Sequence, residues 1–379
     1  MVATASALVL MRPPGVAPLA GYAVAIASDR RRAYLAEAME QHGARSVSIQ
    51  AVRTYTTADE IALRAATEAV IAEPVEELVV TSNFGFSLWL RSAARWGMRD
   101  ALLGRFRGAR LLAASARAAD GLREAGFAEI WSTAAGTAEE IVRYLLAQRL
   151  PGRHIAMQCG GPDSIDLCHA LRRAGTNLIA VPTYQCAPPA HADILRRLGE
   201  QIEYRQIDAI VFASPEAVEN VLAQARVDGR LDAVLNAFAT DLPAVCRTEL
   251  GAAPLRALGV TPIIGSAPFG EEALDAVVGA VGRRAVRLRI SGHRMEVRGQ
   301  AVVMNGELVA IQPGPIGVLR TLARHPGQVM SCADIRRETP GWTQSDDHAI
   351  EMAVSRLRRS LNGGDMIQTV MKRGYRLAV

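Results

Sequence analysis

The fold of this chain is constrained most by an internal duplication, because residues 18–282 repeat themselves at a spacing of about 132 residues. The paired landmarks are Gly43 in QHGARSVSI with Gly175 in RAGTNLIAV, Ser82 in VVTSNFG with Ser214 in VFASPEAV, and Gly126 in LREAGF with Gly259 in LRALGV. A fourth pair, GTAEEIVRYLL and GEEALDAVVGAV, follows in the same order. Self-similarity at a constant spacing predicts two halves of the same architecture.

Each half alternates short apolar runs with stretches of helical periodicity. The runs that predict strands are Ala23–Ala27, Leu78–Thr81, Ile155–Gln158 and Ala209–Phe212. This alternation predicts an α/β fold with two pseudo-symmetric lobes, each a parallel sheet with helices on both faces.

Two stretches with Thr-Tyr after an apolar run predict the points at which the chain crosses between the lobes. They are AVRTYTTADE at residues 51–60 and AVPTYQCAPPAH at residues 180–191. We therefore expect a flexible tail over residues 1–17, one lobe built from 18–52 and 185–282, and a second lobe over 53–184. A separate C-terminal domain would occupy residues 283–379.

Polar residues follow two of the predicted strands. Ser82, Asn83 and Ser214 stand where a strand ends and a helix begins. Parallel sheets bind ligands beyond the carboxyl ends of their strands, and helix starts offer free N–H groups that suit carboxylates or phosphates. These residues are candidate ligand contacts. Each of them could equally be an ordinary helix N-cap.

Basic charge is concentrated in the C-terminal quarter of the chain. Residues 283–379 hold 16 Lys and Arg against eight Asp and Glu, whereas the first 282 residues hold 27 against 30. This asymmetry favours a polyanion-binding domain attached to a nearly neutral body, although a small domain can also be basic without binding a polyanion.

The C-terminal quarter has the pattern of a three-helix domain with β-hairpins. Residues 287–298 and 301–308 alternate like two strands, and helices are expected over 313–324, after Ser331, and after Ser345 or Asp346. The third helix carries an apolar stripe beside a basic face, and a final hairpin carries Lys372, Arg373 and Arg376. Such a helix suits the major groove of DNA, and such a hairpin suits phosphates or the minor groove. A basic, solvated structural domain is the alternative.

The motifs HPGQVMS, AIEMAVSRLRRSL and IQTVMKRGYRL closely resemble the winged helix-turn-helix effector domain of OmpR-type response regulators. The resemblance implies double-stranded DNA as the partner, bound by a homodimer or by paired monomers. It assigns a base contact to Arg356, phosphate contacts to His348 and Arg358, and a backbone-side position on the wing to Thr369. Ser355 and Met371 replace two common arginines, and the remaining expected DNA contacts are Ser355, Arg359, Lys372 and Arg373.

The two-lobed part resembles uroporphyrinogen-III synthase in its layout, in VVTSNFG and VFASPEAV at strand ends, and in the VPTY linker. That family cyclises hydroxymethylbilane, a polycarboxylate tetrapyrrole, without a cofactor. The resemblance implies ligand contacts from Ser82, Asn83 and Ser214, and it makes Tyr184 the candidate catalytic residue for proton handling.

The sequence departs from the synthase family at two turns. The usual Gly-Pro-x-Thr is replaced by residues 115–118 (SARA) and 248–251 (TELG), and neither has the threonine in fourth place. Arg117 and Arg247 could bind ligand carboxylates instead, or could simply be solvated arginines. We therefore expect a ligand sensor more than an enzyme. A working synthase that also binds DNA is the alternative.

Lys372 is the only lysine in the chain. A Walker A phosphate loop, a Schiff-base lysine and a phosphoreceiver domain each need a lysine earlier in the chain, so these classes are excluded. The five cysteines lack CxxC spacing, and Cys159 with Cys168-His169 is a weak metal motif, so we expect reduced cytoplasmic thiols and no metal.

These observations together predict a cytoplasmic one-component transcription regulator with a tetrapyrrole or another polyanionic ligand. Uroporphyrinogen III is a precursor of sirohaem, the cofactor of nitrite and sulfite reductases. Genes of nitrate and nitrite assimilation, or other sirohaem-linked genes, are therefore the expected targets.

Overall fold

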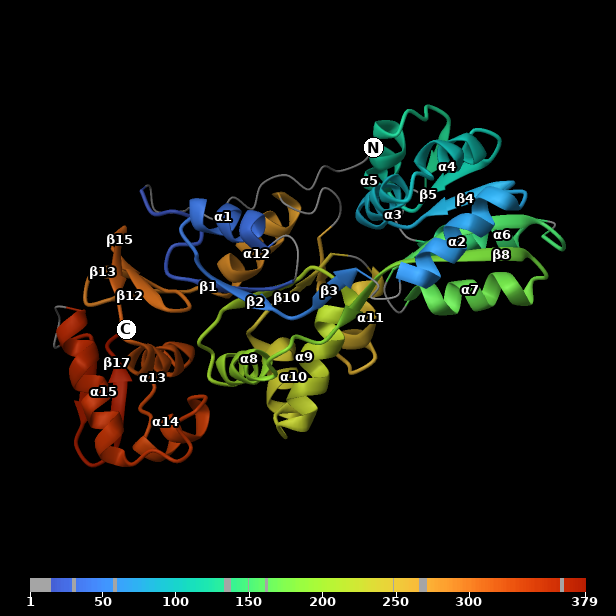
Figure 1. The fold of residues 1–379 in the computed structure, drawn as a ribbon. Helices are drawn as coiled ribbons and strands as arrows, with labels where there is room; N and C mark the ends of the chain where they lie inside the picture. Colours follow the sequence, from blue (N-terminus) through green and yellow to red (C-terminus); the bar gives the residue numbers. More distant parts are fainter. Residues whose placement is uncertain are drawn as a thin grey trace. The chain divides into compact units, whose positions relative to one another are not determined.

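The computed structural model describes residues 15–28, 32–56, 60–132, 138–148, 150–160, 163–247, 249–265, 271–361 and 365–379. Most of the expected N-terminal tail, Thr248 of the second turn, and Asn362–Gly364 lie outside the described residues. The chain divides into two compact units (Figure 1). We call residues 53–187 the middle unit, and residues up to Val52 together with 188–379 the outer unit.

The middle unit is built on a six-stranded sheet in the order β3-β8-β7-β4-β5-β6. Its strands are β3 (Arg53–Thr56), β4 (Glu77–Val80), β5 (Arg110–Ala113), β6 (Ile130–Ser132), β7 (His154–Gly160) and β8 (Asn177–Ala187). Its helices are α2 (Glu60–Ala72), α3 (Asn83–Arg95), α4 (Arg99–Phe106), α5 (Ala116–Glu124), α6 (Ala138–Leu146) and α7 (Asp163–Arg173). All neighbouring strands are parallel except β3 and β8.

Successive residues of the strands face two separate cores, as the period of two requires. On β4, Leu78 and Val80 pack with α2, α3, α4 and α5 around Trp89. Val79 points the other way and packs with Ile141 of α6 and other residues of α6 and α7. The sheet is therefore covered on both faces, which is why the central strands β4 and β5 carry consecutive apolar residues, Leu78–Val80 and Leu111–Ala113.

The outer unit contains a five-stranded parallel sheet in the order β11-β10-β9-β1-β2. Its strands are β1 (Ala23–Ser28), β2 (Arg45–Gln50), β9 (Ala209–Phe212), β10 (Ala244–Cys246) and β11 (Ile263–Ile264). Its helices are α1 (Arg32–Gln41), α8 (Asp193–Glu203), α9 (Pro215–Val227), α10 (Leu231–Thr240), α11 (Glu249–Arg256) and α12 (Glu271–Arg284). Figure 1 shows α1 and α12 on one face and α8, α9 and α10 on the other. The four strands expected from apolar runs are thus confirmed as β1, β4, β7 and β9.

The two Thr-Tyr stretches lie side by side as an antiparallel pair. In the ladder between β3 and β8, Tyr55 stands opposite Gln185 and Thr56 opposite Tyr184. The two stretches thus belong to one sheet, and the chain leaves the middle unit directly after it, at Ala187.

The C-terminal quarter begins with four strands, where the alternation predicted two. They are β12 (Val286–Ile290), β13 (His293–Val297), β14 (Ala301–Met304) and β15 (Glu307–Ala310), and they form one antiparallel sheet. The prediction was wrong because Ser291 and Gly292, both at positive φ, make a two-residue hairpin turn. Such a turn leaves the polar-apolar alternation of its flanks unbroken, so the break is easily overlooked.

The helical part of this quarter follows the prediction. It consists of α13 (Pro313–Arg324), α14 (Cys332–Glu338) and α15 (Asp347–Ser360), followed by the hairpin β16 (Ile367–Val370) and β17 (Gly374–Leu377). Ser331 caps α14 in a reciprocal capping box with Asp334, and α15 is capped by Asp346, not by Ser345. The apolar stripe of α15 is buried in a core shared with α13 and the sheets.

Candidate nucleic-acid interface and ligand site

Helix α15 presents a polar face opposite its buried stripe. Ile350, Val354 and Leu357 are buried, whereas Ser355 and Arg356 are exposed. The adjacent Arg359 is also exposed. Within the described residues, neither the Arg356 nor the Arg359 guanidinium has a hydrogen bond or ion pair. Their donors are therefore open to an external acceptor, and Arg can bind a guanine edge or a phosphate in this way.

Arg358 lies differently from its neighbours. Its guanidinium donates from Nε and Nη2 to the carbonyl oxygen of Ile367, at 2.9 and 2.7 Å, and from Nη2 to Thr369 Oγ1 at 2.8 Å. It also lies over the Tyr375 ring at 6.0 Å. Arg358 therefore ties α15 to the first strand of the hairpin, a bond that sequence reasoning did not foresee. Its expected phosphate contact stays a prediction.

The terminal hairpin ends in an exposed, basic tip. Met371, Lys372 and Arg373 connect β16 to β17, and all three are exposed. Lys372 adopts the left-handed conformation, with φ 59°, which turns the chain tightly back into β17. His348, near the start of α15, is exposed and lies 3.8 Å from the Glu351 carboxylate. The predicted DNA contacts thus come from α15 and the hairpin, which the Arg358 bonds join.

In the middle unit, Ser82 and Asn83 stand at the carboxyl end of β4. The Ser82 hydroxyl accepts from the Gly85 N–H at 3.1 Å and caps α3, and Asn83 Oδ1 accepts from Ser87 Oγ at 2.9 Å. Ser115 caps α5 in the same way at the end of the neighbouring β5, and Arg117 follows it, exposed. Both hydroxyls are engaged as N-caps. The helix starts therefore offer a ligand their remaining N–H groups.

Gln158 holds this edge of the sheet together, and the sequence analysis missed it. Its buried Oε1 accepts from the backbone N–H groups of Thr81 and Ser82, at 3.1 and 3.0 Å. Its Nε2 donates to Thr183 Oγ1 at 2.8 Å. Gly85 is needed opposite, because a Cβ there would come within 2.1 Å of Gln158 Nε2. A glutamine inside an otherwise apolar strand was the available signal.

Tyr184 lies on β8 beside the end of β7. Its ring packs edge-on against Phe84, with 5.4 Å between centroids, and it covers Gly160, where a Cβ would come within 2.1 Å of the ring. The ring is half-buried. The middle unit therefore gathers Ser82, Asn83 and Tyr184 at one edge of its sheet.

The outer unit has a corresponding edge. Ser214 follows β9 and caps α9, accepting from the Ala217 N–H at 3.4 Å, and Arg247 follows the neighbouring β10, exposed. Ser28 ends β1 on the other side of β9, and its hydroxyl is buried with no hydrogen-bond partner among the described residues. Ser28 is a further polar group at this edge that the sequence analysis did not single out.

The comparisons with known proteins agree with this geometry. The family model described as uroporphyrinogen-III synthase HemD matches residues 33–274, more than half of the chain. The chain belongs to the uroporphyrinogen-III synthase family. A second model, described as transcriptional regulatory protein, C terminal, matches residues 306–377. The chain is therefore a uroporphyrinogen-III synthase-like module fused to an OmpR-type winged-helix DNA-binding domain.

Three relatives illustrate the two parts. A mutant uroporphyrinogen III synthase from the extremely thermophilic bacterium Thermus thermophilus is 23% identical and covers 69% of this chain and 99% of its own, with a TM-score of 0.57. This likeness shows the fold. The DNA-binding domain of CpxR from E. coli is 29% identical over 24% of this chain and 98% of its own, with a TM-score of 0.21. The uncharacterized protein YjjA of Bacillus subtilis is 22% identical over 192 residues, 51% of this chain and 71% of its own.

The described residues include neither a membrane-spanning helix nor a group of metal ligands. No described helix combines the length and apolar character needed to cross a membrane. No group of three or more His, Cys, Asp or Glu among the described residues is placed to hold a metal ion. Cys159 and Cys168 lie 3.4 Å apart, sulfur to sulfur, and both are free thiols.

Proposed function

We propose that this protein is a one-component transcription regulator whose synthase-like module senses a tetrapyrrole or another polyanionic metabolite. The fusion itself carries the proposal, because a synthase-family module and a regulator's DNA-binding domain share one chain. A homodimer or a pair of monomers on two half-sites is the expected DNA-bound form. We place the protein in the cytoplasm, where its five free thiols would stay reduced.

In each unit, the carboxyl end of the parallel sheet offers candidate ligand contacts. In the middle unit we propose Ser82, Asn83 and Arg117, and in the outer unit Ser214 and Arg247. Ligand would act by favouring one arrangement of the chain over another, with a free energy no larger than its difference in affinity for the two. Because uroporphyrinogen III leads to sirohaem, genes of nitrate and nitrite assimilation are the proposed targets.

Genome-wide mapping of bound DNA tests the regulatory function and identifies the targets at once. In vitro, binding to a recovered site should weaken as salt rises, by about 0.9 log unit in the association constant per log unit of salt for each phosphate neutralised. The matched variant is Arg359→Gln, which removes one exposed charge from α15. If Arg359 contacts a phosphate, the variant should show a shallower salt dependence, by about 0.9 log unit in the association constant per log unit of salt. A salt-independent affinity would remove the electrostatic basis of the proposal.

A working synthase that also binds DNA is the second candidate. It is favoured by the observation that this chain covers 99% of a synthase chain, so no large part of that fold is missing. The test is cyclisation of hydroxymethylbilane by the purified full chain, with Tyr184→Phe beside it. Formation of the type III isomer, lost or slowed in Tyr184→Phe, would establish the enzyme. If the wild-type chain is folded but inactive, the enzyme hypothesis is refuted and the sensor hypothesis stands.

A further inference from the structure

The winged-helix domain is bound within the outer unit to the lobe that carries the five-stranded sheet. The turn between β13 and β14 makes the main contact. There the Gln300 N–H donates to the carbonyl oxygen of Gly21 at 2.7 Å, and Arg298 Nη1 donates to the carbonyl oxygen of Ala20 at 2.6 Å. These bonds hold the domain on the segment that leads into β1.

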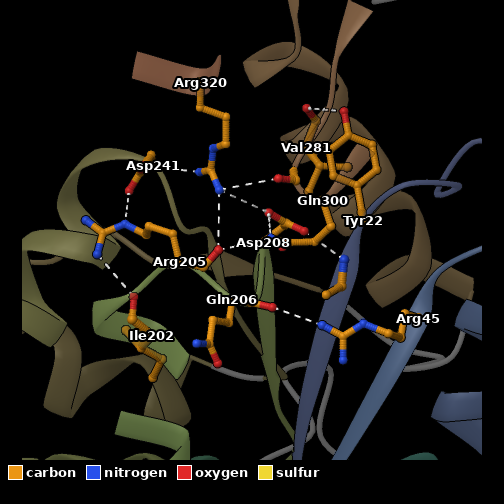
Figure 2. A network of polar contacts seen from close by, with 12 residues as sticks. Tyr22, Arg45, Ile202, Arg205, Gln206, Asp208, Asp241, Val281, Gln300 and Arg320 are labelled. Atoms are coloured by element: carbon orange, nitrogen blue, oxygen red, sulfur yellow. Dashed lines mark hydrogen bonds and ion pairs between the residues drawn. The ribbon is translucent and has the colours of Figure 1, made fainter. Parts of the chain in front are cut away.

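Asp208, at the start of β9, is the centre of the contact. Its carboxylate accepts from the Ala23 N–H at 2.7 Å and from Gln300 Nε2 at 3.1 Å, and Arg320 of α13 lies 3.8 Å from it. Figure 2 shows the Arg320 guanidinium between the two carboxylates, with Asp241 on its other side. Burial raises the pKa of Asp208 to about 6, although Arg320 opposes this. The hydrogen bonds and Arg320 thus only partly offset the hydration that the Asp208 carboxylate loses on burial.

Positive charge exceeds negative charge around Asp241. Three guanidinium groups share this one carboxylate: Arg205 at 2.6 Å, Arg324 at 2.7 Å and Arg320 at 3.6 Å. A fourth, Arg284 at the end of α12, lines a cavity beside them; within the described residues it has no hydrogen bond or ion pair, although Asp241 attracts it electrostatically. Four guanidinium groups, those of Arg205, Arg284, Arg320 and Arg324, thus surround the two carboxylates of Asp208 and Asp241, and this excess of positive charge would favour an added anion.

A cavity of about 250 Å³ opens between these groups. Arg284 reaches it from α12, Arg320 and Arg324 reach it from α13, and Tyr22 and Thr240 add hydroxyl groups. The carboxylates of Asp208 and Asp241 also line it. This space has room for several waters, or for a small organic anion in their place. Asp208 in its lining stands at the start of β9, whereas Ser214 follows the end of that strand, so this cavity is separate from the ligand site proposed for the strand ends.

We propose that this cavity is a second ligand site, which binds a small dianion such as a dicarboxylate or a phosphate. The anion would accept from Arg284 on the lobe and from Arg324 on the winged-helix domain, as arginine does with carboxylate and phosphate oxygens. Because these two groups come from opposite sides of the contact, bound anion would stabilise the attached position of the DNA-binding domain.

The test is isothermal titration calorimetry on the full chain at constant ionic strength, without DNA, so that its outcome does not depend on the proposed regulation. The probes are succinate and citrate in one arm and inorganic phosphate and pyrophosphate in the other, which distinguishes carboxylate from phosphate ligands. We expect at least one probe to bind at one site per chain with a Kd below about 1 mM. No saturable binding of any probe would overturn the proposal.

Arg284→Gln is the decisive variant, because Arg284 has no hydrogen bond or ion pair to lose within the described residues, only a longer-range attraction to Asp241. We expect it to weaken binding by about tenfold or more, the usual weight of one charge-assisted contact. Arg289→Gln is the matched control, since Arg289 is exposed on the nearby β12 and does not line the cavity. Equal losses in both variants would mean attraction to general surface charge and would also overturn the proposal. Circular dichroism checks that both variants are folded.

Discussion

Replacing Gln158 by methionine should destabilise the middle unit while leaving its size and packing nearly unchanged. Methionine cannot accept from the Thr81 and Ser82 N–H groups, so two backbone donors lose their partner. The Thr81 hydroxyl keeps a bond, because it also donates to the Gln158 carbonyl oxygen at 3.0 Å. An orphaned buried donor costs about 1–3 kcal/mol, and both residues are half-buried, so we expect a loss of about 2–4 kcal/mol.

The assay is urea unfolding of the full chain, followed by tryptophan fluorescence. Three of the four tryptophans, Trp89, Trp96 and Trp131, belong to the middle unit, so the signal reports mainly on that unit. The control is Gln185→Met on the neighbouring strand, where the glutamine is exposed and a loss within about 0.5 kcal/mol is expected. If Gln158→Met cost no more than this control, the assigned hydrogen bonds would not be holding the strand ends.

Three further predictions concern DNA recognition and the domain contact. Arg356→Ala should cost about 1–3 kcal/mol at one base position of the operator in a binding assay over single-base variants, and equal losses at every sequence would make it a phosphate contact. Because burial raises the pKa of Asp208 from 3.8 to about 6, the folded chain retains a proton that the unfolded chain has released between these values. The unfolding free energy of wild type relative to Asp208→Asn should therefore fall by about 2 kcal/mol as pH rises from about 4 to about 6, and a constant difference would refute this. Gly299→Ala places a Cβ within 1.9 Å of the Asp208 carboxylate and should speed hydrogen exchange across the β13–β14 turn, whereas Gly282→Ala, with nothing within 4 Å, should not.

The parts of the fold that could be predicted from the sequence depend on neighbours along the chain. The strands with apolar runs, the stripe of α15 and the Ser331 cap are local patterns, and all are present. The role of Gln158 could not be predicted, because its partners directly after β4 and on β8 lie beside β7 only through the order of strands in the sheet. The ion pairs of Arg320 with Asp208 and Asp241 also join residues far apart in the sequence. Nothing in the composition of α13 indicates which surface of the lobe it packs against.

The site predictions have the same limit. Ser82 and Ser214 do lie at strand ends, as predicted. The sequence alone does not distinguish a serine hydroxyl that caps a helix from one that is free to bind a ligand. Arg358 was assigned by its position in the winged-helix family. Its bonds to Ile367 and Thr369 depend on how the hairpin returns to α15, which local periodicity does not encode.

The bond from Arg298 to Ala17 joins residues that are 281 positions apart. During synthesis, Arg298 is made long after the N-terminal segment that it binds. The middle unit, residues 53–187, is synthesised much earlier. Contacts of such long sequence separation form late, because a large loop must close first. The DNA-binding domain can thus pack on this segment only after the synthase-like module has been made in full. A chain that ends before Arg298 would lack this contact.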